Sequence, residues 1–144
     1  MNKTLQQKLY LLKIKQQISE IKGIDIQEIV YQKPEILQWF DDELRNEFNK
    51  IERNIPIIAE ISYLEEKNTI AKKLQEIVYP QTTFILDFGE LYLIFSITSF
   101  SAFLNSLNDI YSSRDVTLFF SDQPKLVDIH LAEHFFEFRI LAKG

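Results

Sequence analysis

The period of the hydrophobic pattern changes at Pro80, and this change constrains the fold more than any other feature. Before Pro80, apolar residues recur every three or four positions, which is the spacing of one face of an α-helix. After Pro80, apolar and polar residues alternate, as in strands with one buried face. The sequence therefore predicts an α+β fold, with a helical layer over residues 1–79 packed on one face of an antiparallel sheet over residues 80–144.

The first helix is predicted from its capping signals. Thr4 and Gln7 have the spacing of a capping box, and Gly23 is a residue typical of the position after a helix. The segment between them carries two apolar stripes, one made of Leu5, Leu9 and Leu12 and the other of Leu11, Ile14, Ile18 and Ile21. We therefore expect a helix that is able to pack on two sides.

Three further helices are expected before Pro80. A short one begins near Asp25 and Glu28, and a longer one begins at Pro34, where a proline is tolerated in the first turn. The longer helix has apolar residues at helical spacing: Leu37, Phe40, Leu44, Phe48 and Ile51. Residues 57–78, between Pro56 and Pro80, show an amphipathic pattern typical of a last helix.

The second half predicts about five strands, near residues 82–88, 91–98, 116–121, 126–131 and 135–141, with one helix inserted near 100–111. A two-residue turn at Gly89 and Glu90 sets the register of the first hairpin, because a glycine supplies positive φ. Its expected pairs are all apolar: Phe88 with Leu91, Leu86 with Leu93, and Phe84 with Phe95.

A second meander follows, and its registers are predicted from two turns. A four-residue loop at 122–125 would place Phe120 opposite Val127 and Leu118 opposite Ile129. A turn at 133–134 would oppose two pairs of complementary charge, which supports that register: Asp128 with Arg139, and His130 with Glu137.

These registers divide the side chains between two faces. The face expected under the N-terminal helices carries Phe84, Leu93, Leu118, Ile129 and Phe138. The opposite face carries aromatic and charged residues: Tyr92, Ile94, Phe119 and Phe135 beside Asp87, Asp128, His130 and Glu137. Either the helix at 100–111 covers this second face or it is exposed, and an exposed face of this kind is a candidate binding surface.

The composition excludes several classes of function. A chain of 144 residues fits a single domain, and the absence of cysteine rules out disulfides, thiol nucleophiles and thiolate metal sites within it. We expect a cytoplasmic protein without an export signal, and no membrane partner, because polar residues interrupt the one long uncharged stretch at 91–108. No glycine-rich phosphate loop is present, so no cofactor is expected.

The net charge of −5 is concentrated in the second half. Residues 80–144 hold four basic and eight acidic side chains, compared with 12 and 13 in residues 1–79. Phosphate binding requires clustered Lys and Arg, so nucleic acid is not an expected partner. A protein with a basic surface would instead be attracted to this half.

One motif permits a catalytic interpretation. Residues 130–134, with His130 and His134 at the ends, match H-x-x-E-H, in which two histidines on one helix bind zinc and the glutamate activates water. Because the motif falls where two alternating runs meet at a turn, a zinc-dependent hydrolase remains only an alternative. No other catalytic signature is present, and we do not expect an enzyme.

The small size, the acidic charge and the lack of cysteine make this chain similar in general character to the immunity proteins of bacterial contact-dependent growth-inhibition and polymorphic toxins. The resemblance implies tight binding of a cognate toxin domain, often a basic nuclease, by an acidic surface. From the residues themselves, the expected partner-binding set is Asp87, Glu90, Tyr92, Phe119, Asp122, Asp128 and Glu137.

A self-assembling structural or regulatory protein is the second hypothesis. The stripe at 57–78 or an open strand edge would then form contacts between copies, and a homodimer is possible.

Overall fold

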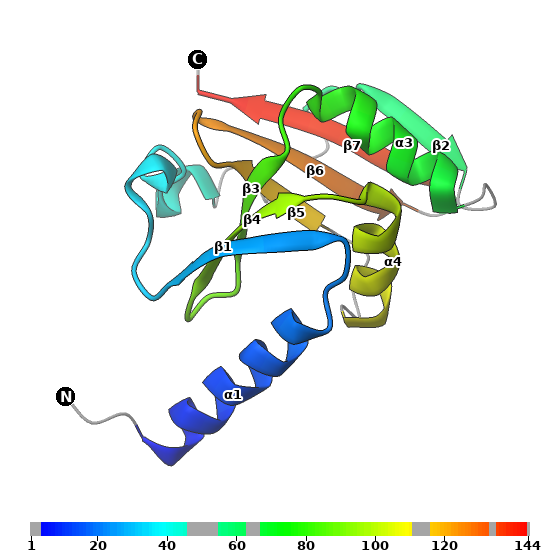
Figure 1. The fold of residues 1–144 in the computed structure, drawn as a ribbon. Helices are drawn as coiled ribbons and strands as arrows, with labels where there is room; N and C mark the ends of the chain where they lie inside the picture. Colours follow the sequence, from blue (N-terminus) through cyan, green and yellow to red (C-terminus); the bar gives the residue numbers. More distant parts are fainter. Residues whose placement is uncertain (1–3, 46–54, 63–66, 111–115, 133–134, 144) are drawn as a thin grey trace.

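The computed structural model describes residues 4–45, 55–62, 67–110, 116–132 and 135–143 (Figure 1). Its elements follow one another along the chain as α1 (Leu5–Ser19), β1 (Ile24–Val30), η1 (Glu35–Leu37), β2 (Ala59–Ser62), α3 (Lys67–Val78), β3 (Thr83–Asp87), β4 (Tyr92–Ile97), α4 (Phe100–Ile110), β5 (Val116–Phe120), β6 (Lys125–Ala132) and β7 (Phe135–Ala142). The fold is α+β, as predicted, with helices interspersed among the strands.

Strands from both halves of the chain join one antiparallel sheet. Within the described residues this sheet has seven strands in the order β1-β4-β3-β5-β6-β7-β2, and every neighbouring pair is antiparallel. The five strands expected after Pro80 are confirmed. The expectation of a purely helical first half was wrong, because β1 and β2 form the two edges of the sheet.

A β-bulge explains why the sequence did not indicate strand β1. Ile26 pairs with Phe95 and Ile29 pairs with Leu93, and the register shifts between Ile26 and Glu28. The extra residue at the bulge places Ile26 and Ile29 on the same face although they are three positions apart. The bulge interrupts the two-residue alternation of a strand, so the pattern did not indicate β1, and the spacing of Asp25 and Glu28 suggested a short helix instead.

The predicted helix at 57–78 is confirmed only from Lys67 onward, where α3 begins. Ala59–Ser62 instead form β2, in which Ile61 lies opposite Phe136 of β7. A four-residue strand has little local signal, because its stability comes from a partner strand more than 70 positions later in the chain.

The helix expected from Pro34 to Ile51 is replaced, in its described part, by two shorter pieces. Glu35–Leu37 form the 3₁₀-helix η1, and residues 42–45 are helical. Asp41 caps this second piece, since its Oδ1 accepts a hydrogen bond of 2.8 Å from the Leu44 amide. Phe48 and Ile51 lie outside the described residues.

The registers of two hairpins are confirmed. Phe84 lies opposite Phe95 and Leu86 opposite Leu93, and the Phe88 amide donates to the Leu91 carbonyl at 2.9 Å. Between β6 and β7, the expected charge-complementary pairs Asp128–Arg139 and His130–Glu137 are opposed. The turn residues Glu133 and His134 themselves lie outside the described residues.

The register between β5 and β6 differs from the prediction by two residues. Leu118, rather than Phe120, lies opposite Val127, and Val116, rather than Leu118, lies opposite Ile129. The loop still has four residues but occupies 121–124 instead of 122–125. A shift of two keeps every side chain on its predicted face, because strand side chains alternate with a period of two.

The inner face of the sheet carries the main core. It contains the predicted residues Phe84, Leu93, Leu118, Ile129 and Phe138, and all five are buried. Helices α1, α3 and α4 cover it with Ile14 and Ile18, with Leu74, and with Phe103 and Leu107, respectively (Figure 1). The helix at 100–111, expected as a possible cover for the opposite face, therefore packs on the inner face as α4.

The outer face of the sheet is divided into two parallel rows. The apolar row runs across five strands through Ile94, Ile85, Phe119, Leu126 and Leu141. The polar row, two residues further along these strands, contains Tyr92 and Asp87 as one pair and Thr117, Asp128 and Arg139 as consecutive partners. The outer face is thus not covered by α4, and it is exposed only in part, at residues such as Phe135.

The segment around η1 covers the apolar row. Leu37 and Phe40 are buried in one cluster with Ile85 and Phe119, and the rings of Phe40 and Phe119 are 5.3 Å apart. This edge-on contact covers the half of the outer face that would otherwise be an apolar patch.

Among the described helices, each is too short or too polar to span a bilayer.

Candidate functional site

The pair formed by Asp87 and Tyr92 lies at the end of β3 and β4, beside the turn that joins them. The two residues are opposed in the ladder, and Glu90 is exposed in the turn. Asp87 also shapes this turn, because its Oδ1 accepts a hydrogen bond of 2.7 Å from the amide of Gly89, which has a φ of 85°. Three of the predicted partner-binding residues are therefore brought together.

A segment distant in sequence completes this site. The Arg45 Nη2 atom lies 3.1 Å from the Asp87 Oδ2 atom, and its guanidinium is 5.3 Å from the centroid of the Phe40 ring. On a helix Arg45 would face Asp41, four positions earlier, but Asp41 instead caps the helical piece that contains Arg45. Residues 42 positions apart thus form the ion pair, and no local pattern indicates such a contact.

Tyr92 lies close enough to three charged side chains, Asp87, Arg45 and Asp42, for each of them to act on its pKa. Burial raises its pKa above the ordinary value of 10.0, the Asp87 carboxylate raises it further, the Arg45 guanidinium lowers it, and the Asp42 carboxylate raises it. We call Asp42, Asp87 and Glu90 around Tyr92 the acidic patch. With Arg45 included, its net charge is −2.

The predicted residues Asp128 and Glu137 belong to a second cluster, together with Thr117 and Arg139. Asp128 is 2% exposed and accepts a hydrogen bond of 2.8 Å from the Thr117 hydroxyl. The Arg139 guanidinium donates to the Ile55 carbonyl at 3.1 Å and to Glu137 at 2.9 Å. These groups are paired with one another inside the fold. The cluster therefore holds chain segments together and offers little surface to a partner.

Two predicted residues do not join the acidic patch. Phe119 is 3% exposed beneath Phe40, so its contacts are internal. Asp122 is exposed in the loop at 121–124, where the Ser121 amide donates to the Thr83 carbonyl at 3.3 Å. Because Thr83 begins β3 and Asp87 ends it, this loop lies at the opposite end of the strand from the acidic patch.

His130 of the H-x-x-E-H motif lies on a strand and not on the helix that the zinc motif requires, and Glu133 and His134 lie outside the described residues. His130 lies on β6 opposite Glu137, and the strand continues to Ala132 before β7 begins at Phe135. Residues four positions apart lie about one turn apart on a helix, but about 13 Å apart along a strand, which is too far for both to bind one zinc ion. Within the described residues, no group of three His, Asp or Glu side chains is placed to hold a metal ion.

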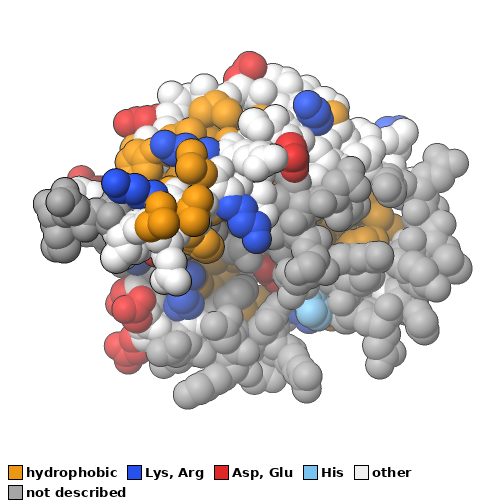
Figure 2. Space-filling view, turned by 90° about the horizontal axis from the view of Figure 1, so that it is seen from below, with side chains coloured by type: hydrophobic (Ala, Val, Ile, Leu, Met, Phe, Trp, Pro, Cys, Tyr) orange, Lys and Arg blue, Asp and Glu red, His pale blue; other side chains and the backbone are white. Residues whose placement is uncertain are grey.

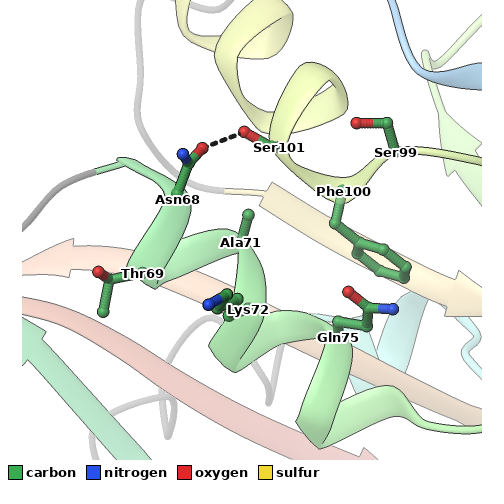
Figure 3. A pocket seen from close by; sticks show the side chains of 8 residues that line it. All are labelled: Asn68, Thr69, Ala71, Lys72, Gln75, Ser99, Phe100 and Ser101. Atoms are coloured by element: carbon green, nitrogen blue, oxygen red, sulfur yellow. Dashed lines mark hydrogen bonds between the residues drawn. The ribbon is translucent and has the colours of Figure 1, made fainter.

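A shallow pocket lies between α3 and α4, with a volume of about 480 Å³. Figure 3 shows Asn68 and Ser101 joined by a hydrogen bond at one end, with Gln75 and Phe100 toward the other. Lys72 is the one titratable residue in its lining, so the lining offers no acid and base pair for catalysis. The pocket is a gap between two packed helices.

Comparison with known proteins adds no relative. No protein-family model matches this sequence, and neither a curated protein nor a solved structure matches it. The site must therefore be interpreted from its own geometry.

Sequence reasoning missed Asp42 and Arg45 as members of the site. The sequence showed a charged run at 41–43 that is typical of a solvated helix face, and the exposure of these acids agrees with that interpretation. Their position beside Tyr92 depends on how the segment after η1 crosses the apolar row. Of the predicted set, Asp87, Glu90 and Tyr92 belong together, whereas Asp122, Phe119 and the pair Asp128 and Glu137 lie elsewhere.

Proposed function

We propose that this chain is a non-catalytic binding domain of the immunity-protein kind, which neutralises a cognate bacterial toxin domain by covering it with the acidic patch. One observation carries the proposal: the fold brings Asp42 and Asp87 to the partly exposed Tyr92, beside the turn in which Glu90 is exposed. Carboxylates around an aromatic anchor are suited to binding a basic protein surface, such as that of a nuclease.

The patch combines a fixed part with an exposed part. Asp87 is held by Arg45 and by the Gly89 amide, so it orders the turn and Tyr92. Asp42 and Glu90 are exposed and supply the long-range attraction that speeds association. Neutralisation by occlusion requires no cofactor, and a cysteine-free chain suits the reducing cytoplasm in which such a toxin would act.

The test uses the protein encoded directly before this chain, which the proposal expects to be the toxin, produced with and without the chain in a bacterial host. We expect the chain to restore growth and the purified proteins to bind one to one. The variant Asp42→Lys with Glu90→Lys should associate roughly ten to one hundred times more slowly, with a weaker dependence on salt.

A matched control reverses two exposed acids outside the patch, Glu60→Lys with Asp122→Lys, and changes the net charge equally. The control should associate at nearly the native rate. Equal slowing by both variants would show that only total charge matters and would refute the acidic patch as the docking surface. A neighbouring protein that is neither toxic nor bound would refute the immunity function.

A further inference from the structure

Helix α1 is capped at its start and is anchored to the body of the molecule by hydrogen bonds just after its end. At its start, the Thr4 hydroxyl accepts from the Gln7 amide at 3.1 Å and the Gln7 side chain accepts from the Thr4 amide at 2.9 Å. After its end, the Gly23 carbonyl accepts from the amides of Thr98 and Ser99, and the Lys22 amide donates to Ser106. The helix is therefore preformed and held at a defined angle to the body of the molecule.

Only one of the two apolar stripes of α1 is covered. Ile14 and Ile18 are buried in the main core, whereas Leu5, Leu9 and Leu12, on the other side, are 72%, 56% and 63% exposed. These three leucines have the spacing i, i+4 and i+7 of a helix that docks into another surface. In Figure 1, α1 extends away from the sheet, and in Figure 2, hydrophobic side chains gather there beside lysines.

The charge of α1 is opposite to that of the rest of the chain. The helix contains Lys8, Lys13 and Lys15 and no acidic residue, so it contributes +3 to a chain of net charge −5 and the other residues together carry −8. Lys15 lies 5.4 Å from the Tyr31 ring. In the described part of the chain, no carboxylate forms an ion pair with Lys8 or Lys13. An acidic, partly apolar surface would complement this helix.

The edge strand β1 has these complementary properties. Its exposed residues include Asp25, Ile26 and Glu28, and Tyr31 directly after it is also exposed. Among the described strands it pairs with β4 alone, so no described strand pairs with its other edge. The bulge after Ile26 and the two carboxylates oppose direct pairing with the edge strand of another molecule. A helix with basic and apolar side chains, lying against this edge, would pair with its carboxylates and bury its exposed apolar groups.

We propose that a second copy of this chain covers the leucine stripe, in a two-fold symmetric dimer in which α1 of each copy packs against β1 of the other. Lys8 and Lys13 of one copy face Asp25 and Glu28 of its partner, and the leucines contact Ile26 and Tyr31. The two-fold symmetry forms this contact twice: α1 of the first copy packs against β1 of the second, and α1 of the second packs against β1 of the first.

Other occupants fit the charges less well. Packing α1 against the same helix of another copy would place lysines against lysines without a compensating acid. An anionic membrane would attract α1 but repel the −8 of the body. A stable interface buries about 800 Å² on each side, which favours the doubled contact over a single three-leucine stripe. The dimer is independent of the proposed toxin binding.

The first measurement is the mass of the full-length chain by light scattering, over protein concentrations from about 1 to about 100 µM. We expect the mass to approach twice 17.1 kDa as the concentration rises. Leu9→Asp, at an exposed position away from the core, should abolish the dimer while leaving the helical circular dichroism unchanged. A chain that stays monomeric throughout this range overturns the proposal.

A charge exchange gives the decisive test. The α1 variant, Lys8→Glu with Lys13→Glu, and the β1 variant, Asp25→Lys with Glu28→Lys, should each dimerise at least about tenfold more weakly than the native chain. An equimolar mixture should form a heterodimer, because each α1 then meets a β1 of opposite charge. Recovery in the mixture also shows that both variants are folded.

Two controls reverse equal charges elsewhere: Lys72→Glu with Lys143→Glu, and Glu60→Lys with Asp122→Lys, all at exposed positions. Both should dimerise like the native chain. The proposal is overturned if the variants stay dimeric alone, if their mixture stays monomeric, or if the controls lose the dimer equally. A monomer that instead sediments with anionic phosphatidylserine vesicles would assign the stripe to membranes and would equally overturn it.

Discussion

The two faces of the sheet are stabilised in different ways. The inner face is apolar along its whole length and is buried under α1, α3 and α4. The outer face is apolar in one row, which the segment around η1 covers, and polar in the next, where Thr117, Asp128 and Arg139 are consecutive partners. The inner face is thus held by burial alone, and the outer face by burial together with hydrogen-bonded charges.

This difference separates stability from specificity. A continuous apolar face supplies most of the folding free energy but accepts many arrangements of covering helices. A buried charge requires its partners at defined positions, so the polar row favours one path for the chain segments that cross it. The acidic patch lies at the end of that row. There the ion pair with Arg45 fixes Asp87 close to the surface.

The largest expected effect is on the inner face. Phe95 is fully buried, with its ring 5.5 Å from that of Phe103 and 6.5 Å from that of Phe84. Phe95→Ala should lower the free energy of unfolding by about 4 kcal/mol, because it removes the ring and leaves a cavity. Urea denaturation measures this change. Phe135→Ala, at a half-exposed ring, is the control, and a similar loss there would contradict the contrast between core and surface.

A somewhat smaller effect is expected in the polar row. Asp128→Leu should cost about 3 kcal/mol, because Arg139 then loses the carboxylate opposite it and stays buried. Adding Arg139→Met should cost less than the sum of the two single changes, because it removes a buried cation that has lost the carboxylate opposite it and keeps only that of Glu137. A double-mutant cycle in urea measures the coupling. Strict additivity would show that the two residues act independently.

The smallest expected effect on the free energy of unfolding comes from Tyr92, at the end of the polar row beside Asp87, and it depends on pH. Burial, the larger cause, and the Asp87 carboxylate raise the pKa of Tyr92 above 10.0, so the unfolded chain loses this proton first as pH rises. The contribution of Tyr92 is therefore complete below about pH 10 and is lost as pH rises through the folded-state pKa.

Tyr92→Phe should remove this part of the alkaline destabilisation, measured by urea unfolding between about pH 8 and about pH 11. Asp87→Asn should lower the pKa of Tyr92, which carbon NMR of the tyrosine ring would detect. A Tyr92 pKa below 10.0 in the native chain would show that Arg45, rather than burial, dominates this end of the sheet.

Local sequence signals predicted the elements whose partners are close in the chain. The Gly89 turn and the alternation around it placed Phe84 opposite Phe95, and the Thr4 capping box marked the start of α1. The edge strands were missed because a bulge interrupts the two-residue alternation of β1 and because β2 depends on β7, more than 70 residues later. Part of the candidate site was missed for the same reason, since Arg45 reaches Asp87 only when the segment after η1 crosses the sheet.

The amino-acid pattern was enough to establish which side chains share a face, because the two-residue alternation of a strand is a local property. It also revealed the second stripe of α1, with Leu5, Leu9 and Leu12 opposite the core. Which surface covers each face could not be read from any local pattern. Burial is non-directional and rewards any apolar cover, so the complete packing selected α4 for the inner face and Phe40 for the outer one.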